Sequence, residues 1–190
     1  MKRSTVYGIG INDSPIGYQP DLYFICWRDI MKRCSNNNKL RYHTYDNATV
    51  CDKWKSFWVF RQWLIDNNYT KGMNVDKDYC SPGNKHYSPE TCIVVTKKIN
   101  LFLTKSDRIR GEYPIGVTYT KANKKNPYVS YYRIHGKKCY LGCFPQVELA
   151  SNAYYTKKQE IALIYKDEVN DPKVKDALQR VHDNIREYFK

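Results

Sequence analysis

Hydrophobic side chains in the first third of the chain recur at helical spacing. From Leu22 to Cys34 the apolar positions fall three or four residues apart, and the run stops at the Ser-Asn-Asn-Asn stretch, residues 35–38. A denser aromatic run follows over about residues 54–66. Apolar residues at this spacing line one face of an amphipathic helix, so the sequence predicts two helices. We expect the aromatic run to be core, because large rings are usually buried.

The period changes between residues 74 and 103. Val75–Asp78 has an extended pattern, and Pro82, Gly83 and Asn84 indicate a loop. A strand is expected at Thr91–Val95 and a helix from near Thr96 to about Leu103. This segment therefore predicts the order strand, loop, strand, helix. Residues 1–20, rich in Gly, Pro, Asn and Asp, predict an irregular arm.

The second half of the chain alternates with period two before it becomes helical again. Three short strands are expected at "IGVTY", "YVSYYRI" and "KCYLGCF", followed by an amphipathic helix over residues 146–166 and a terminal helix from about Pro172. The predicted class is α+β, with N-terminal helices, a strand–strand–helix core, a three-stranded antiparallel sheet packed on a helix, and a C-terminal helix. We expect domains at 1–104 and 113–190, joined by a linker at 105–112.

Charge is concentrated in one part of the chain. The net charge is +13 over 190 residues, and residues 105–166 hold twelve Lys and Arg against four Asp and Glu, a local net charge of +8. Tyrosines lie between these lysines. A concentrated positive field of this kind favours a polyanionic partner such as nucleic acid, although a merely soluble basic surface is the alternative.

Composition argues against a membrane protein. The mean hydropathy is −0.73, no apolar run approaches the ~18 residues of a spanning helix, and the first residues, MKRSTVYGIG, lack the apolar segment of a signal peptide. We therefore expect a cytoplasmic protein with no membrane partner. Seven cysteines, an odd number, then predict reduced thiols. Zinc bound by Cys34, Cys51, Cys80 and Cys92 is the alternative, but no C-x-x-C pair supports it.

Two side chains of the strand–loop–strand–helix segment offer hard oxygen ligands. Asp76 lies at the end of the first strand and Asn100 on the following helix. A divalent cation that assists phosphodiester cleavage requires oxygen ligands and open positions for water and phosphate. If the strands pair and the helix packs across them, Asp76 and Asn100 could share one Mg²⁺ or Mn²⁺ ion. A hairpin and helix without any metal is the alternative.

The ordered motifs of this segment resemble a known family. The sequence "VDKD", "GNK", "YSPETC" and "IN" is similar to the HNH nuclease core in the form carried by phage homing endonuclease-like proteins, and "VYGIGIND", "WRDIMKRC", "TVCDKWKSFWVFRQW" and "RGEYPIGV" match the same family in the same order. The resemblance covers nearly the whole chain. It implies a ββα-metal fold and metal-dependent hydrolysis of double-stranded DNA in the cytoplasm of a phage-infected bacterial host.

Carried over by position, the resemblance assigns roles to individual residues. Asp76 and Asn100 take the metal positions, Thr91 stands at the central asparagine that orients the loop, and Lys77 stands at the general base. A lysine ammonium cannot accept a proton. Three outcomes stay open: Lys77 contacts phosphate or stabilises charge, His86 or His43 supplies the base, or the site is inactive. Asn84 is expected to brace the loop.

The basic segment resembles a second family. Gly116-Val117, Tyr132-Arg133, Leu141-Gly142 with Phe144, and Ala150 with Ala153-Tyr154 are similar to the plant ethylene-response-factor type of DNA-binding domain, whose sheet lies in the major groove. The groove-facing set by position is Thr118, Thr120, Tyr131, Arg133, Lys138 and Tyr140. The inward set is Val117, Tyr132, Leu141 and Phe144.

Arg133 and the lysines of the sheet have different expected roles in that binding mode. The fork of Arg133 matches a guanine edge. The phosphate contacts are expected from turn lysines, which carry no sequence information. These lysines are Lys121, Lys124, Lys125 and Lys137.

The sequence thus predicts a nicking or homing-type endonuclease that acts as a monomer or weak dimer, with no small-molecule substrate. One such site per monomer cuts one strand, so a nick is expected. Two alternatives remain: a DNA-binding protein whose nuclease site is inactive and which acts by occupancy in regulation or against host defence, and an adaptor that binds protein through its aromatic helices.

Overall fold

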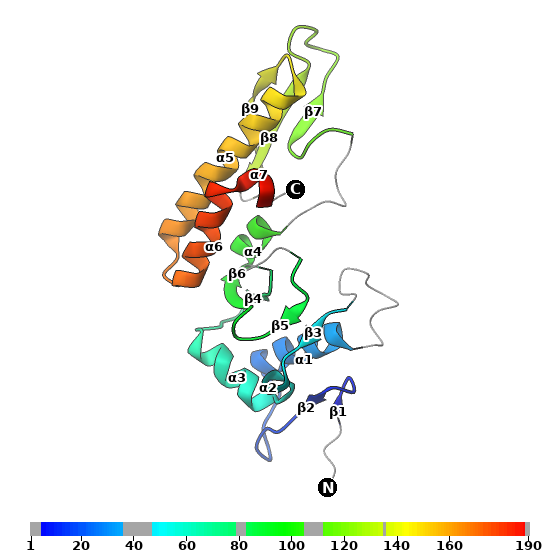
Figure 1. Ribbon diagram of the computed structural model, residues 1–190, viewed down its shortest axis with the longest axis vertical. Coiled ribbons are helices and arrows are strands. Elements are labelled where there is room, and N and C mark those ends of the chain that lie inside the picture. The colour runs from blue at the N-terminus through cyan, green and yellow to red at the C-terminus, as the bar shows by residue number, and fades with distance from the viewer. Residues whose placement is uncertain (1–4, 36–46, 79–82, 105–111, 135, 189–190) are drawn as a thin grey trace. The chain divides into compact units, whose positions relative to one another are not determined.

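The computed structural model describes residues 5–35, 47–78, 83–104, 112–134 and 136–188. The protein is α+β, as the sequence predicts. Among these residues it contains helices, three two-stranded sheets and one three-stranded sheet (Figure 1). The chain divides into two compact units, Met1–Asn100 and Leu101–Lys190. Most of the predicted linker, residues 105–111, lies outside the described residues. No helix among the described residues is long and apolar enough to cross a membrane.

The first unit begins with a short hairpin instead of the irregular arm that the sequence predicts. Strand β1 (Thr5–Val6) pairs antiparallel with β2 (Gly10–Ile11). The turn between them contains Tyr7 and Gly8 at positive φ. Gly10 packs so closely on α1 that an added Cβ would lie 2.7 Å from the ring of Trp27. These strands are too short for a period-two pattern to show in the sequence.

Helix α1 (Leu22–Cys34) has the predicted bounds, and the aromatic run forms two helices where one is predicted. Asp21 caps α1 by accepting the N–H groups of Tyr23 and Phe24, each at 3.0 Å. Helix α2 (Asp52–Lys55) ends at Ser56, which is extended and caps α3 (Phe57–Asp66). The break is stabilised by Asp13, whose carboxylate accepts hydrogen bonds from the Ser56 hydroxyl and the Trp58 N–H.

The first unit also contains two other small sheets. Strand β3 (Thr49–Val50) pairs parallel with β5 (His86–Tyr87), and β4 (Met73–Asp76) pairs antiparallel with β6 (Ile93–Thr96). Helix α4 (Lys97–Leu103) begins directly after β6. The strand, loop, strand, helix order is therefore confirmed, and the β3–β5 pair is an addition that local pattern did not predict.

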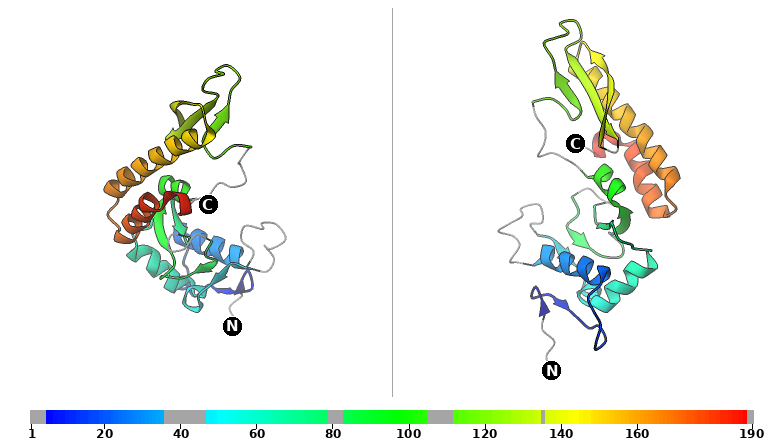
Figure 2. Two further views of the ribbon diagram at one scale, coloured as in Figure 1. Left: turned by 45° about the horizontal axis from the view of Figure 1, so that its top comes forward. Right: turned by 180° about the vertical axis from the view of Figure 1, so that it is seen from behind.

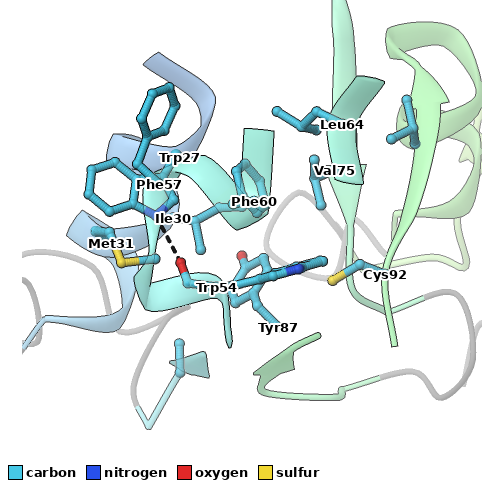
Figure 3. Close-up of a cluster of buried hydrophobic side chains, with 12 residues drawn as sticks. Trp27, Ile30, Met31, Trp54, Phe57, Phe60, Leu64, Val75, Tyr87 and Cys92 are labelled. Carbon is cyan, nitrogen blue, oxygen red and sulfur yellow. Dashed lines mark hydrogen bonds between the residues drawn. The ribbon is translucent and has the colours of Figure 1, made fainter. Parts of the chain in front are cut away.

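The core of the first unit consists mainly of the aromatic side chains of α1, α2 and α3 (Figure 3). Trp27 donates its indole N–H to the Trp54 carbonyl at 2.8 Å. The other large side chains of this core are all under 2% exposed. They are Ile30, Met31, Phe57, Phe60, Leu64, Tyr87 and Cys92. The expectation that the aromatic run is core is confirmed for Trp54, Phe57 and Phe60, whereas Trp58 is 39% exposed. Because Val75 and Val94 pack on the same cluster, the core also supports the β4–β6 pair.

The second unit is a three-stranded antiparallel sheet with a long helix against one face (Figure 2). Strands β7 (Val117–Tyr119), β8 (Tyr128–Ile134) and β9 (Lys137–Phe144) pair in that order, and α5 (Val147–Glu168) contacts all three. Helices α6 (Pro172–Asp183) and α7 (Ile185–Tyr188) pack on α5 through Val174, Ala177, Leu178, Val181 and Ile185.

Candidate metal centre and nucleic-acid interface

The loop between β4 and β6 is closed by the side chain of Asn84. Its Nδ2 donates to the carbonyls of Lys77 and His86, both at 2.8 Å, and its Oδ1 accepts the His86 N–H at 3.1 Å. One amide therefore links the end of the first strand to the start of β5. Because three hydrogen bonds converge on it, Asn84 fixes the loop at its base, as the sequence predicts.

Thr91 braces the other side of the same loop. Its Oγ1 donates to the His86 carbonyl at 2.7 Å and accepts the Ser88 N–H at 3.1 Å. The Thr91 hydroxyl, which the sequence predicts to orient the loop, is therefore hydrogen-bonded to backbone groups of the loop. The His86 carbonyl therefore accepts hydrogen bonds from both the Asn84 and the Thr91 side chains.

Asp76, the last residue of β4, is 9% exposed. Its Oδ1 accepts the Asp78 N–H at 2.7 Å. Burial raises the pKa of the Asp76 carboxyl above its ordinary value; the hydrogen bond from Asp78 opposes that rise, and the Asp78 carboxylate adds to it. A buried carboxylate whose ionised form is disfavoured gains from a nearby cation.

Lys77 is 8% exposed, and its ammonium forms hydrogen bonds within the loop. Nζ donates to Asp78 Oδ1 at 2.8 Å and to the Asn84 carbonyl. It also lies 5.9 Å from the centroid of the Tyr87 ring. Lys77, the predicted general-base position, is therefore a cation that ties the end of β4 to the loop. This arrangement supports loop structure and offers no proton acceptor.

His86, the residue predicted as the alternative base, is half-buried in β5. Its Nδ1 lies 2.9 Å from Thr49 Oγ1. When Nδ1 carries the proton and donates to Thr49, Nε2 holds the lone pair that a general base requires. Thr49 was not predicted, because the contact joins residues 37 positions apart through the β3–β5 pair. His43, the other candidate base, lies outside the described residues.

Asn100, the second predicted metal ligand, is half-buried in α4. Helix α4 begins at the Thr96 hydroxyl, which accepts the Ile99 N–H at 3.3 Å. Among the described residues no group of three or more His, Cys, Asp and Glu side chains could hold a metal ion. That Asp76 and Asn100 share one divalent cation therefore stays a prediction.

The cysteines near this loop are described as free thiols. Cys34, Cys51 and Cys92 are three of the four residues of the alternative zinc site, and none forms a disulfide. Burial raises the pKa of Cys34 and of Cys92 to about 12. Both thiols are therefore protonated at neutral pH in the metal-free protein. Cys80 lies outside the described residues.

The strand register places most of the predicted groove-facing side chains on one face of the second unit's sheet. Tyr131 pairs with Tyr140, Arg133 with Lys138, and Thr118 with Val129, so alternation sets these residues on the side opposite Tyr132. Tyr132 packs on Tyr154 of α5, with ring centroids 5.3 Å apart. We call the side bearing Thr118, Tyr131, Arg133, Lys138 and Tyr140 the outer face.

Two predicted positions differ from simple alternation. Thr120 lies just after β7, and its Oγ1 accepts the Ala122 N–H at 3.2 Å, so it belongs to the turn. Leu141, predicted to face inward, is the extra residue of a bulge, because Ser130 pairs with Gly142 while Tyr131 pairs with Tyr140. A bulge cannot be predicted from alternation alone.

The predicted phosphate-binding lysines lie in the β7–β8 turn and at the start of β9. Lys121, Lys124 and Lys125 are exposed in the β7–β8 turn. Lys137 is exposed as the first residue of β9 rather than in a turn. Lys138 Nζ lies 3.5 Å from the centroid of the Tyr131 ring, a cation–π contact that holds the ammonium on the outer face.

Comparison with known proteins gives no relative for this chain. No protein-family model, no curated protein and no solved structure matches it.

Proposed function

We propose that the protein is a divalent-metal-dependent endonuclease for double-stranded DNA, with an HNH-like ββα unit formed by β4, β6 and α4. The observation that carries the proposal is the braced loop. A buried carboxylate ends β4, Asn84 and Thr91 fix the backbone beside it, and a helix bearing Asn100 follows β6 at once.

In this proposal Asp76 and Asn100 hold one Mg²⁺ or Mn²⁺ ion. When bound, the cation supplies Lewis-acid stabilisation of the phosphate oxygens and activates water. The raised pKa of Asp76 means that burial makes its ionised form less favourable. A bound cation would offset this loss of free energy. Lys77 keeps the loop closed through Asp78 and Asn84, and Nε2 of His86 accepts the proton from water while Thr49 orients the ring.

The second unit supplies DNA binding in this proposal. Its outer face presents Arg133 and Lys138, and the adjoining turn presents Lys121, Lys124 and Lys125. The segment's net charge of +8 over residues 105–166 is complementary to a phosphate backbone. One cleavage site per chain cuts one strand, so the expected product is a nick.

A second candidate is a DNA-binding protein that acts by occupancy without cleavage. The observation that favours it is Lys77, whose ammonium bonds Asp78 and Asn84 where a base would stand. Both candidates share the DNA-binding surface and differ in whether His86 replaces the missing base. The two are therefore separated by cleavage and not by affinity.

A nicking assay on supercoiled plasmid with Mg²⁺ or Mn²⁺ tests the proposal. We expect the wild type to produce open circles, Asp76→Ala and Asn100→Ala to lose at least 100-fold in rate, and His86→Ala to lose about 10²–10⁴-fold, the usual contribution of a general base. Asp52→Ala is the matched control, because that carboxylate is exposed and pairs only with Lys55 among the ion pairs described.

Each result of this assay has a defined meaning. Salt-sensitive binding without nicking by any protein favours the occupancy candidate. Nicking that survives Asp76→Ala excludes Asp76 as a ligand of the catalytic metal. Nicking that is unaffected by His86→Ala moves the base to another group. If Lys77→His then raises the rate, the position of Lys77 is the site that lacks a base.

A further inference from the structure

The ring of Tyr140 lies along the outer face instead of standing upright on it. Its hydroxyl donates to Cys143 Sγ at 3.1 Å. Residues three apart on a regular strand point to opposite faces. The bulge at Leu141 places Tyr140 and Cys143 on the same face, and the hydroxyl can reach the thiol only when the ring is laid along the strand.

This orientation exposes an apolar surface within a basic one. Tyr140 is 59% exposed. The opposite ring, Tyr131, has its centroid 5.7 Å away and is covered by the Lys138 ammonium at 3.5 Å. Arg133 lies two residues further along β8, in the next cross-strand pair on the same face. The outer face therefore combines one accessible aromatic ring with two flanking cations.

Major-groove chemistry offers a matching pair of features. The thymine C5-methyl is an apolar group on the groove floor, and apolar side chains contact it. The guanine O6 and N7 atoms accept a bidentate arginine. The hydroxyl of Tyr140 already donates to Cys143, so the outward surface of this residue is mainly its ring.

We propose that Tyr140 recognises a thymine methyl in the major groove of duplex DNA while Arg133 recognises a nearby guanine. This inference rests on the proposed function, because it assumes that the outer face enters the groove. Tyr140 and Arg133 belong to cross-strand pairs two residues apart. That spacing is about 6.6 Å along a strand, or about two base-pair steps of ~3.4 Å. With strands aligned along the groove, one base pair separates the thymine from the guanine.

The test compares thymine with uracil, which lacks only the methyl group. The full chain, without divalent cation, selects its preferred sites from a library of randomised duplexes. Affinity is then measured for the selected duplex with thymine or uracil at each position. Removing one contacted methyl should weaken wild-type binding about 4-fold, the equivalent of about 0.8 kcal/mol per buried carbon.

Two variants assign that effect to a side chain. Tyr140→Ala should bind thymine and uracil duplexes equally, and exposure of Tyr140 makes a folding defect unexpected. Arg133→Ala, the matched control on the same face, should keep the 4-fold thymine preference and lose the guanine preference.

The outcomes separate this inference from the proposed function. Tight, salt-dependent duplex binding with equal affinity for thymine and uracil overturns the thymine contact and leaves DNA binding intact. Tighter binding to the single strand than to the duplex also overturns it, because the ring would then stack on unpaired bases. Absence of duplex binding contradicts the DNA-binding half of the proposed function itself.

Discussion

Asp76 and Lys77, neighbours at the end of β4, carry opposite charges in different environments. Asp76 is buried with its pKa raised, while the next side chain, Lys77, bonds Asp78 and the Asn84 carbonyl. Both positions were identified from the sequence. The hydrogen bonds of the Lys77 ammonium to Asp78 and Asn84 could not be predicted from it. The side chain that the sequence resemblance places at the general-base position is therefore a hydrogen-bond donor within the loop and not a proton acceptor.

Asp76→Asn should stabilise the metal-free protein at neutral pH. Burial raises the folded-state pKa of Asp76, so the neutral form is favoured by folding. That stabilisation is complete below the unfolded pKa of about 3.9 and is lost as the pH rises through the folded pKa. The asparagine keeps the neutral state and can still accept the Asp78 N–H. Denaturant unfolding should show a gain at pH 7 that shrinks as the pH approaches 4.

Added Mg²⁺ should have the opposite effect, because it should stabilise the wild type and not Asp76→Asn. At tenfold over its dissociation constant it should stabilise the wild type by about 1.4 kcal/mol and leave Asp76→Asn unchanged. Asp52→Asn is the control, because the exposed Asp52 carboxyl has its pKa lowered by Lys55 and gains nothing from neutralisation. A loss of stability for Asp76→Asn at pH 7 without metal would contradict the burial argument.

At the scale of elements, the helices and strands with many repeats of their period were predictable. Helix α1 has the predicted bounds, and β8 matches "YVSYYRI". The missed features depend on contacts distant in sequence: Asp13 stabilises the α2–α3 break, and β3 pairs with β5 across 37 residues. Local periodicity contains no information on such partners. For the same reason, the sequence identified Asn84 and Lys77 as loop residues but did not predict the hydrogen bonds between them.

The turn that leads into β7 depends on Gly116. Its φ is +79°, and an added Cβ would lie 2.0 Å from Cδ2 of Tyr154 on α5. Gly116→Ala should therefore destabilise the second unit by about 2–5 kcal/mol, the sum of left-handed strain and overpacking. Urea unfolding followed through tyrosine signals measures the loss.

Gly136→Ala is the matched control for that substitution. Gly136 has the same φ of +79°, but nothing lies within 4 Å of an added Cβ. Its cost should stay near the strain alone, about 1–2 kcal/mol. Equal losses for the two variants would show that the contact between Gly116 and Tyr154 does not limit the packing of α5 on the sheet.

At the scale of the whole molecule, core and charge are divided between two units. The aromatic cluster of Trp27, Trp54 and Phe57 belongs to the first unit, and the helix pair α5–α6 belongs to the second. The basic segment of residues 105–166 is followed by residues 167–190, with five Lys and Arg against six Asp and Glu. Charge of this kind governs association with polyanions and not the fold. DNA affinity should consequently be lost by charge removal without loss of stability.

Salt dependence distinguishes a phosphate-binding turn from a generally basic surface. Lys124 and Lys125 are exposed in the β7–β8 turn, and Lys173 and Lys175 lie in α6 within the acidic C-terminal segment. Each phosphate contact contributes about 0.9 to the slope of log affinity against log salt. Lys124→Gln/Lys125→Gln should lower that slope by about 2 for the full chain on duplex DNA, whereas Lys173→Gln/Lys175→Gln, with the same loss of net charge, should leave it unchanged. Equal reductions would mean that net charge, and not the turn beside the outer face, determines DNA affinity.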